Sequence, residues 1–528
     1  MAKKQVAKPS WSEAMREHYR RAEFLAAADV YDEAIADGAT PSYEDELRRA
    51  RIALKHDVNA AVASLIRRTP KSSSGARRGE WALLLAIGYA RMRDFERADR
   101  HFEMARRVLT TPADRAQLAY HRSVRQLIEG RTDEAWRLAG EMSCDRSLTT
   151  RISNEMLNSF ILSREERYRE EAQSLIRAIG LIGKQRDAHR EQWFHAVQNL
   201  ALLGRELAFD EAAAVARREV DEDVDWPVDF LTQHFQALKA VGWTCALRGD
   251  LLGCFRYLRA AERSKPSLAY EAILLLDRAY FARIIGEPNW SRDEVAKADA
   301  IAERIDWNEL PGEERIGLLL MAEAMAESNP EKAHFYLARY KGLDRIRSPL
   351  HLFAFDRRCD AFAAYAEGVA RLKGGETGAE EALRSAWTIF DRIGYDWRAS
   401  RTALSLLEAT KKERWRHLAE DKLEAYPQSW LAREISQHDV ATTEAVRLPR
   451  MQRKVLDMLC QKMTTAEIAT DLGLSQHTIR NHLKAVFRAY DVHNRASLVA
   501  EVARRGELPA PAIGKEAGST RRRSTGTG

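Results

Sequence analysis

The sequence predicts an all-α protein, with a long array of helical hairpins followed by a small C-terminal domain. Its 528 residues include only 14 Pro and 27 Gly, whereas Ala, Leu, Glu and Arg, which favour helices, are abundant. The chain also exceeds the roughly 250–300 residues at which a single core stops growing. A pattern of small and bulky residues recurs at intervals of 34 to 42 residues over its first half. These observations favour a helical repeat array over one compact domain.

The recurring pattern is a small residue in a helical run, followed four residues later by a bulky one. Small residues let two helices cross closely, and the bulky neighbour fills the groove beside them. Two helices with short turns need roughly 34–40 residues, so each interval accommodates one hairpin. Residues 11–435 are therefore predicted to form helical hairpins, with room for one near Ala296. The pattern is anchored at Ala27, Ala61, Ala98, Ala135, Ala172, Ala212, Cys254, Ala333 and Ala382.

Two segments carry the pattern most completely. One has Tyr89, Phe95, Ala98, Phe102 and Ala105; the other has Leu238, Gly242, Gly249, Cys254, Leu258, Ala261 and Pro266. Both resemble tetratricopeptide repeats, which implies a tetratricopeptide-like α-solenoid whose long groove takes a peptide or protein segment. An irregular α-solenoid or helical bundle is the alternative fold for this region.

Three segments lack the apolar periodicity of a packed helix. Residues 1–10 are predicted to be a disordered N-terminus. Residues 506–528, rich in Pro, Gly, Ser and Thr, are predicted to be a disordered tail. Residues 436–447 are predicted to be a linker between the repeats and a domain at 448–505.

The C-terminal domain is predicted to contain four short helices. Thr464 and Glu467 form a capping box for the second helix, and Ser475 caps the third. The turn Gly473-Leu474-Ser475 joins these two helices into a helix-turn-helix. The apolar residues predicted to face the core are Val455, Leu456 and Leu459 in the first helix, Ile468, Ala469 and Leu472 in the second, Ile479, Leu483, Val486 and Phe487 in the third, and Leu498, Val499 and Val502 in a fourth capped by Asn494.

The opposite face of the third helix is polar and has no acidic residue. In a helix-turn-helix this face enters the major groove of DNA. Arg and Lys can donate to guanine and Asn can pair with adenine, so Arg480, Asn481 and Lys484 are the predicted base readers. The predicted contacts to the DNA backbone are Ser475, His477, Thr478, His482, Arg488 and Arg495.

The segment TTAEIATDLGLSQHTIRNHLKAVFRAYDVHNRASLV resembles the LuxR/GerE-type helix-turn-helix, over about 60 residues in all. The resemblance implies a bacterial transcription regulator that binds two-fold related half-sites of double-stranded DNA as a homodimer. It also implies that the fourth helix, with Leu498, Val499 and Val502, forms the dimer contact. The chain departs from the family at Gln452 and Lys454, where glutamates are usual, and at Asp491, where glycine is usual.

The chain lacks the sequence motifs of several other classes of protein. The string nearest to a phosphate-binding GxxxxGK[ST] loop, Gly180–Lys184, is two residues short and reads as a helix end. Five single cysteines and the absence of HExxH indicate no metal site. The longest apolar run, Ile316–Met321, is too short to span a membrane. We therefore expect no catalysis, no cofactor, no membrane insertion and a cytoplasmic location, with Trp243, Trp387 and Trp397 as core residues.

The charges divide unevenly along the chain. Residues 444–505 hold 11 Lys+Arg against 6 Asp+Glu, whereas residues 11–443 sum to −4 within a total of +6. One small basic module, not the whole surface, is suited to DNA. The predicted function is a DNA-binding transcription regulator controlled by a peptide, protein or small molecule bound to the repeats. The alternative is a repeat-based adaptor whose C-terminal domain docks on protein.

Overall fold

The computed structural model divides into two compact units, residues 1–432 and residues 433–528. It describes residues 10–67, 75–222, 225–310, 312–343, 356–442, 448–460 and 463–490, and the single residues 492, 495, 498 and 502. All regular structure in these residues is helical and none is strand, so the prediction of an all-α protein is confirmed.

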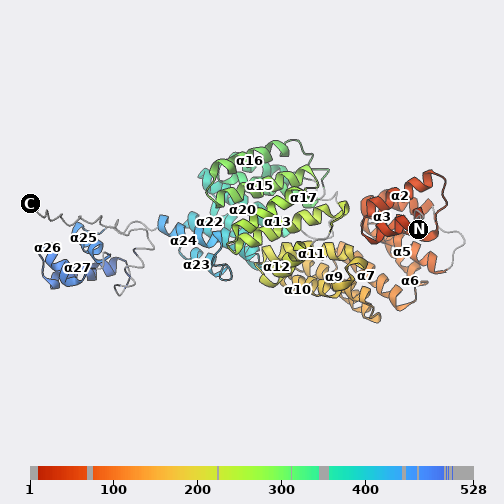
Figure 1. Cartoon of the computed structure of the whole chain (residues 1–528), viewed down its shortest axis with the longest axis horizontal. Coiled ribbons are helices and arrows are strands. Elements are labelled where there is room, and N and C mark those ends of the chain that lie inside the picture. The colour runs from red at the N-terminus through yellow and green to blue at the C-terminus, as the bar shows by residue number, and fades with distance from the viewer. Residues whose placement is uncertain are drawn as a thin grey trace, which may run out of the picture. The chain divides into compact units, whose positions relative to one another are not determined.

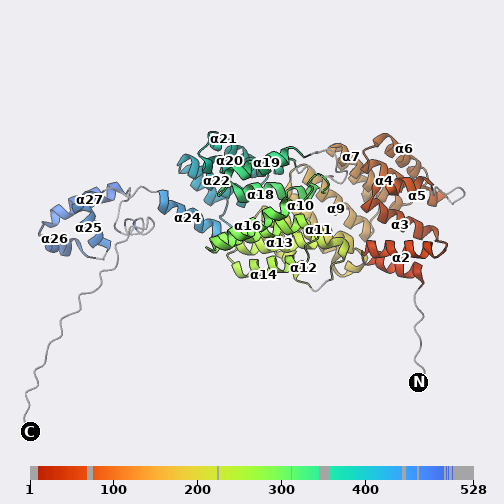
Figure 2. The ribbon, with the colours of Figure 1, turned by 90° about the horizontal axis from the view of Figure 1, so that it is seen from above.

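The first unit is a succession of helical hairpins, which Figures 1 and 2 show following one another from red through yellow and green to cyan. The paired helices are α1 (Trp11–Arg20) with α2 (Phe24–Ala36), α3 (Tyr43–His56) with α4 (Val58–Arg67), α5 (Gly75–Arg91) with α6 (Phe95–Arg106), α7 (Pro112–Glu129) with α8 (Thr132–Glu141), α9 (Leu148–Arg164) with α10 (Tyr168–Ile182), α11 (Arg190–Glu206) with α12 (Asp210–Asp221), α13 (Leu231–Leu247) with α14 (Leu251–Glu262), α15 (Leu268–Ile284) with α16 (Pro288–Ala302), α18 (Gly317–Ala326) with α19 (Pro330–Lys341), α20 (Asp356–Gly374) with α21 (Ala379–Arg392), and α22 (Asp396–Thr410) with α23 (Arg414–Asp421).

Shorter elements complete the two units. The first unit also contains α17 (Gly312–Arg315) and the 3₁₀ turns η1 (Met142–Cys144), η2 (Gly183–Ala188) and η3 (Val228–Phe230). Helix α24 (Trp430–Thr442) runs from the first unit into the second. The second unit contains α25 (Arg450–Cys460), α26 (Thr465–Leu472) and α27 (Gln476–Ala489).

The small residues of the sequence pattern lie where the two helices of a hairpin cross. The anchors from Ala27 to Cys254, and Ala333, lie on the second helix of their hairpins and are at most 1% exposed. On α11, a Cβ added to Gly204 would lie 2.8 Å from the backbone nitrogen of Ala213 on α12. Because the backbones approach this closely, a larger side chain would force the helices apart.

Two anchors are displaced from their expected positions. Near Ala296, which is exposed, the buried small residue is Ala298 on α16. On α21, Ala382 is half-buried and Ala386 is fully buried instead. Sequence spacing places the hairpin in both regions, but the way the helix is rotated against its neighbours decides which small residue is buried.

The array also brings distant hairpins together. Helix α22 lies against α11, about 190 residues earlier in the chain. The indole nitrogen of Trp397 donates to the Glu206 carboxylate at 3.1 Å, and the Tyr426 hydroxyl donates to Asp210 at 2.8 Å. These contacts join α11 and the start of α12 to α22 and to the segment that follows α23.

The expected linker at 436–447 is partly helical, because α24 continues to Thr442. No Gly or Pro interrupts the segment SQHDVATT, and Gln and Ala propagate a helix that has already started. Residues 443–447 lie outside the described residues. Among the described residues, no helix is both long and apolar enough to cross a membrane.

Candidate nucleic-acid interface

Helix α26 begins where the sequence predicts it. The Thr464 hydroxyl accepts from the Glu467 backbone N–H at 3.3 Å, and the Thr464 backbone N–H donates to the Glu467 carboxylate at 2.6 Å. These bonds satisfy two donors that the helix end would otherwise leave unpaired. Hydrogen bonds from the Thr464 backbone and side chain lower the pKa of Glu467, which stays ionised at neutral pH.

The turn between α26 and α27 is held by local backbone bonds. Gly473 has φ of +64°, a left-handed conformation that favours glycine. The Leu474 N–H donates to the Ala469 carbonyl at 2.9 Å. Ser475 then caps α27, accepting from the Thr478 N–H at 3.1 Å. This turn sets the direction of α27 relative to α26.

The apolar faces of these helices form one core in the second unit. Leu472, Leu474 and Phe487 are partly buried against it, and Tyr490, which the sequence analysis did not place, is 2% exposed within it. The core residues that the sequence predicted and the structure buries are Val455, Leu456, Leu459, Ile468, Ala469, Ile479, Leu483, Val486, Leu498 and Val502. Tyr490 falls four residues after Val486, and this periodicity could have revealed it.

With that core fixed, α27 presents a polar surface. Its exposed residues include His477, Arg480, Asn481, Lys484 and Arg488. The helix contains no Asp or Glu at any position. The geometry therefore places all three predicted base readers on one accessible face, which can donate hydrogen bonds to an anionic partner.

The predicted backbone-contact residues are less uniform. Ser475 is exposed, whereas Thr478 and His482 are half-buried. The hydroxyls of Ser475 and Thr478 share a hydrogen bond of 2.8 Å. Arg495 is exposed overall, but its guanidinium donates to the Leu459 carbonyl at the end of α25, at 3.1 Å. Arg495 thus already stabilises the end of α25 within its own domain.

The structure changes the interpretation of the fourth helix. Arg495, Leu498 and Val502 are helical, but Leu498 and Val502 are 0% exposed and pack in the core of their own domain. A dimer contact through this segment would have to use its other faces, because these two side chains are already covered. Val499 and Asn494 lie outside the described residues, as does Asp491.

The structure also places the other residues that the sequence analysis singled out. Gly183 ends α10 with φ of +39°, so the string at Gly180–Lys184 is a helix end. Trp243 and Trp397 are each 6% exposed, and Trp387 is half-buried against Trp415. Among the described residues, no group of three or more His, Cys, Asp or Glu is arranged to hold a metal ion.

Comparison with known proteins identifies this domain. Residues 447–502 match the model of bacterial regulatory proteins of the luxR family. The chain is also 39% identical over 61 residues to the spore germination protein GerE of Bacillus subtilis (strain 168), covering 82% of GerE and 12% of this chain. The chain belongs to the LuxR family. Membership marks it as a bacterial regulatory protein with a helix-turn-helix of the DNA-binding type.

The LuxR-family match covers residues 447–502, and one solved structure aligns with most of the chain. The crystal structure of the APC/C hetero-tetramer Cut9-Hcn1 aligns over 93% of this chain and 95% of that one, with 14% identity and a TM-score of 0.36. In this chain, consecutive helices of the repeat unit pack against each other in pairs and form hairpins.

Proposed function

We propose that this LuxR-family protein binds promoter DNA sequence-specifically through α27 and regulates transcription. The observation that carries the proposal is the exposed face of α27, where Arg480, Asn481 and Lys484 lie together without an acidic residue. In the major groove, Arg and Lys donate to guanine N7 and O6, and Asn pairs with adenine. These three residues would read the bases.

The residues around the base readers would hold the DNA backbone. Ser475 and Thr478 offer hydroxyls at the start of α27, and the positive end of the helix dipole favours a phosphate there. The other proposed backbone contacts are His477, His482, Arg488 and Arg495. Their contribution would be independent of sequence and would fall as salt rises.

The protein would act as a homodimer on two-fold related half-sites in the cytoplasm of a bacterium. Recognition helices of such dimers lie one or more turns of DNA apart, about 34–36 Å per turn. Footprinting should therefore protect a pseudo-palindrome. Protection of one isolated half-site would contradict the dimer.

Control would come from the repeat unit. Its ligand would be a peptide or protein segment in the groove of the array, or a small molecule. By binding one conformation more tightly than another, it would shift the population that is competent for DNA. Because α24 connects the repeats to the helix-turn-helix in sequence, it is the direct covalent path for such a change.

Fluorescence anisotropy with promoter fragments from the protein's own genome tests the DNA-binding function. Arg480→Ala should weaken specific binding by about 1–3 kcal/mol and relax the preference at one base pair. Lys484→Ala should act similarly, whereas the matched change Arg256→Ala, at an exposed residue of α14, should have no effect. Unchanged affinity and preference in the Arg480→Ala/Lys484→Ala double variant would contradict the proposal. Co-precipitation of a protein partner without DNA would instead favour the adaptor.

A further inference from the structure

A cavity lies inside the repeat unit, between helices that are far apart in the sequence. Its walls come from α11, α13, α15, α16, α18 and α22, and its volume is about 90 Å³. This is several times the ~10–15 Å³ that holds one water molecule. It is much too small for a helical or extended peptide. The cavity therefore suits a small molecule.

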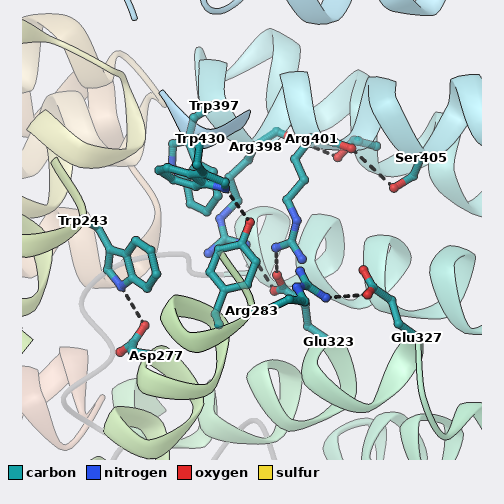
Figure 3. A network of polar contacts seen from close by, with 12 residues as sticks. Trp243, Asp277, Arg283, Glu323, Glu327, Trp397, Arg398, Arg401, Ser405 and Trp430 are labelled. Carbon is teal, nitrogen blue, oxygen red and sulfur yellow. Dashed lines mark hydrogen bonds and ion pairs between the residues drawn. The ribbon is translucent and has the colours of Figure 1, made fainter. Parts of the chain in front are cut away.

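Four arginines line this cavity: Arg205, Arg283, Arg398 and Arg401. Figure 3 shows Arg398 and Arg401 directed at Glu323 and Arg283 paired with Glu327. The Arg398 guanidinium also lies 4.2 Å from the ring centre of Phe362, and that of Arg401 lies 4.6 Å from that of Tyr280. Packing against rings holds these cations in fixed orientations.

The carboxylates of this network do not neutralise it. Arg205 and Arg398 share Glu206, Arg398 and Arg401 share Glu323, Arg283 pairs with Glu327, and Lys239 lies 2.5 Å from Asp277. Among the residues that the structure describes, the network thus contains five cationic side chains and four carboxylates. The cations outnumber the carboxylates by one. Arg283 and Glu327 are each 40% exposed, whereas the other seven side chains are less than a fifth exposed, and burial makes uncompensated charge costly there.

Two N–H donors of the network also make no hydrogen bond in the described part of the chain. The Nε atoms of Arg205 and Arg398 are buried and have no hydrogen-bond partner among the described residues. The Arg398 Nε is 3.5 Å from Glu206, within ion-pair range but without a hydrogen bond, and Arg398 is only 8% exposed. Buried donors normally find partners, and both arginines line the cavity, so a hydrogen-bond acceptor is the ligand chemistry that these two side chains favour.

Flat aromatic surfaces form another part of the wall. Trp243, Tyr280 and Trp397 all line the cavity, and their ring centres lie 5.8, 6.1 and 6.2 Å from that of Trp430. The Trp430 indole donates to the Tyr280 hydroxyl at 3.2 Å. Such rings bind a planar apolar group by offset or edge-to-face packing.

We propose that this cavity is the effector site of the protein and binds a small aromatic monocarboxylate. The carboxylate would take the unused donors of Arg205 and Arg398, since guanidinium groups bind carboxylates with paired hydrogen bonds. It would also balance the excess positive charge. The ring of the ligand would pack against Trp243, Tyr280 and Trp397.

The position of Trp430 makes this a regulatory site. Trp430 contacts the three aromatic residues of the wall and is the first residue of α24, the helix that continues to Thr442. A ligand that shifts those rings would act directly on the start of α24. This part of the inference rests on the proposed DNA-binding function, whereas ligand binding itself does not.

Titration calorimetry on the full chain, without DNA, tests the binding. The probes are benzoate and indole-3-carboxylate, with benzamide as a neutral match for benzoate. A carboxylate should bind once per chain, with quenching of tryptophan fluorescence, and about tenfold or more tightly than benzamide. No saturable binding of either carboxylate, or equal binding of benzamide, would overturn the proposal.

Variants locate the site. Arg205→Gln should weaken carboxylate binding by about tenfold or more, and the fold should tolerate it because Glu206 keeps Trp397 and Arg398 as partners. Arg256→Gln, at an exposed arginine of α14, should leave affinity unchanged. If thermal unfolding shows that Arg205→Gln is misfolded, Arg398→Lys is used instead. This change keeps the positive charge but removes the paired N–H donors of the guanidinium. Unaltered binding in a folded variant would overturn the assignment.

The regulatory role has a separate readout. Adding the carboxylate that calorimetry shows to bind should change the affinity of the full chain for its promoter DNA. Ligand binding with unchanged DNA affinity would overturn the effector role, while loss of all DNA binding would count against the proposed function and leave the calorimetric result intact.

Discussion

The two units use arginine in opposite ways. On α27, Arg480 and Arg488 stand in solvent on a face without carboxylates, so they can bind an anionic partner. In the repeat unit, Arg398 and Arg401 are buried on α22 and paired with Glu323. Removing an exposed arginine changes the stability of the fold by little, about 0–1 kcal/mol, whereas a buried pair that loses one member leaves a charge without compensation. Replacing an exposed arginine of α27 should therefore affect binding alone, whereas replacing a member of the buried network should affect both binding and stability.

Glu323→Ala tests the buried side of this comparison and should have the largest effect. Arg398 and Arg401 would lose their common carboxylate in the interior, which should lower the free energy of unfolding by about 3–5 kcal/mol. Urea unfolding of the full chain measures it. The matched change is Glu96→Ala, because Glu96 pairs with Arg100 at 3.1 Å on the surface; it should alter stability by less than about 0.5 kcal/mol. Equal effects of the two changes on stability would contradict the proposed difference between buried and exposed ion pairs.

Ile479→Ala in α27 should destabilise only the second unit. Ile479 is 0% exposed, and truncating a buried isoleucine typically removes about 2–5 kcal/mol, enough to unfold a domain of this size. Hydrogen exchange should show faster exchange across α25–α27 and unchanged protection in α11 and α13. Arg480→Ala, one residue later and exposed, should lose specific DNA binding without changing exchange. Loss of protection in both variants would show that Arg480 is structural.

Glu171 on α10 gives the repeat unit a pH dependence. Burial raises its pKa to about 7, against the opposing effect of the Arg358 guanidinium. Between pH ~4.5 and ~7 the carboxyl is ionised in the unfolded chain but protonated in the folded one. The stability of the unit therefore falls as pH rises through this window, by up to ~3 kcal/mol.

Glu171→Gln should abolish that fall, because an amide of similar shape does not ionise. Urea unfolding of the variant and the parent at pH 5 and pH 8 measures it, with the gain in the variant appearing at pH 8. Glu96→Gln, at a surface site, is the control. A difference between variant and parent that stays the same at both pH values would contradict the assignment to Glu171.

The smallest effects concern the hairpin turns. The turn before α12 has Ala208 at φ of +49°, where the turn before α14 has Gly249 at +82°. Ala208→Gly should relieve left-handed strain and raise stability by up to ~1 kcal/mol. Gly249→Ala should lower it by about 1 kcal/mol or more, because the added Cβ would lie 2.9 Å from the Gln428 carbonyl. The urea midpoints of the two variants should move in opposite directions.

The helix-turn-helix could be predicted from the sequence in detail because its signals are local. The capping box of Thr464, the left-handed Gly473 and the cap of Ser475 each act within a few residues. The spacing from Ile479 to Val486 then fixes which face of α27 is buried. The role of Arg495 could not be predicted in this way. Its hydrogen bond to the Leu459 carbonyl joins residues 36 positions apart, and no local sequence pattern indicates such a contact.

The helical hairpins of the repeat unit could be predicted from the sequence, but the cavity proposed to bind a ligand could not. The small residues on α2 to α14 are buried, as the pattern predicts. Trp243 and Trp397 are buried as predicted, yet they also line a cavity with Arg205 and Arg401. Their positions in the sequence are separated by up to 196 residues, and the packing of α22 against α11, α15 and α18 brings them together.

By itself, the sequence determined the all-α class, the hairpin unit, and the helix-turn-helix with its polar face, because helix caps, turn residues and 3.6-residue periodicity act over short distances. The tertiary structure decided which small residues are buried, that Leu498 and Val502 belong to the core of their own domain, and that four arginines from three helices line one cavity. These outcomes depend on how whole helices pack against each other, and a change in rotation or partner moves every side chain on a helix at once.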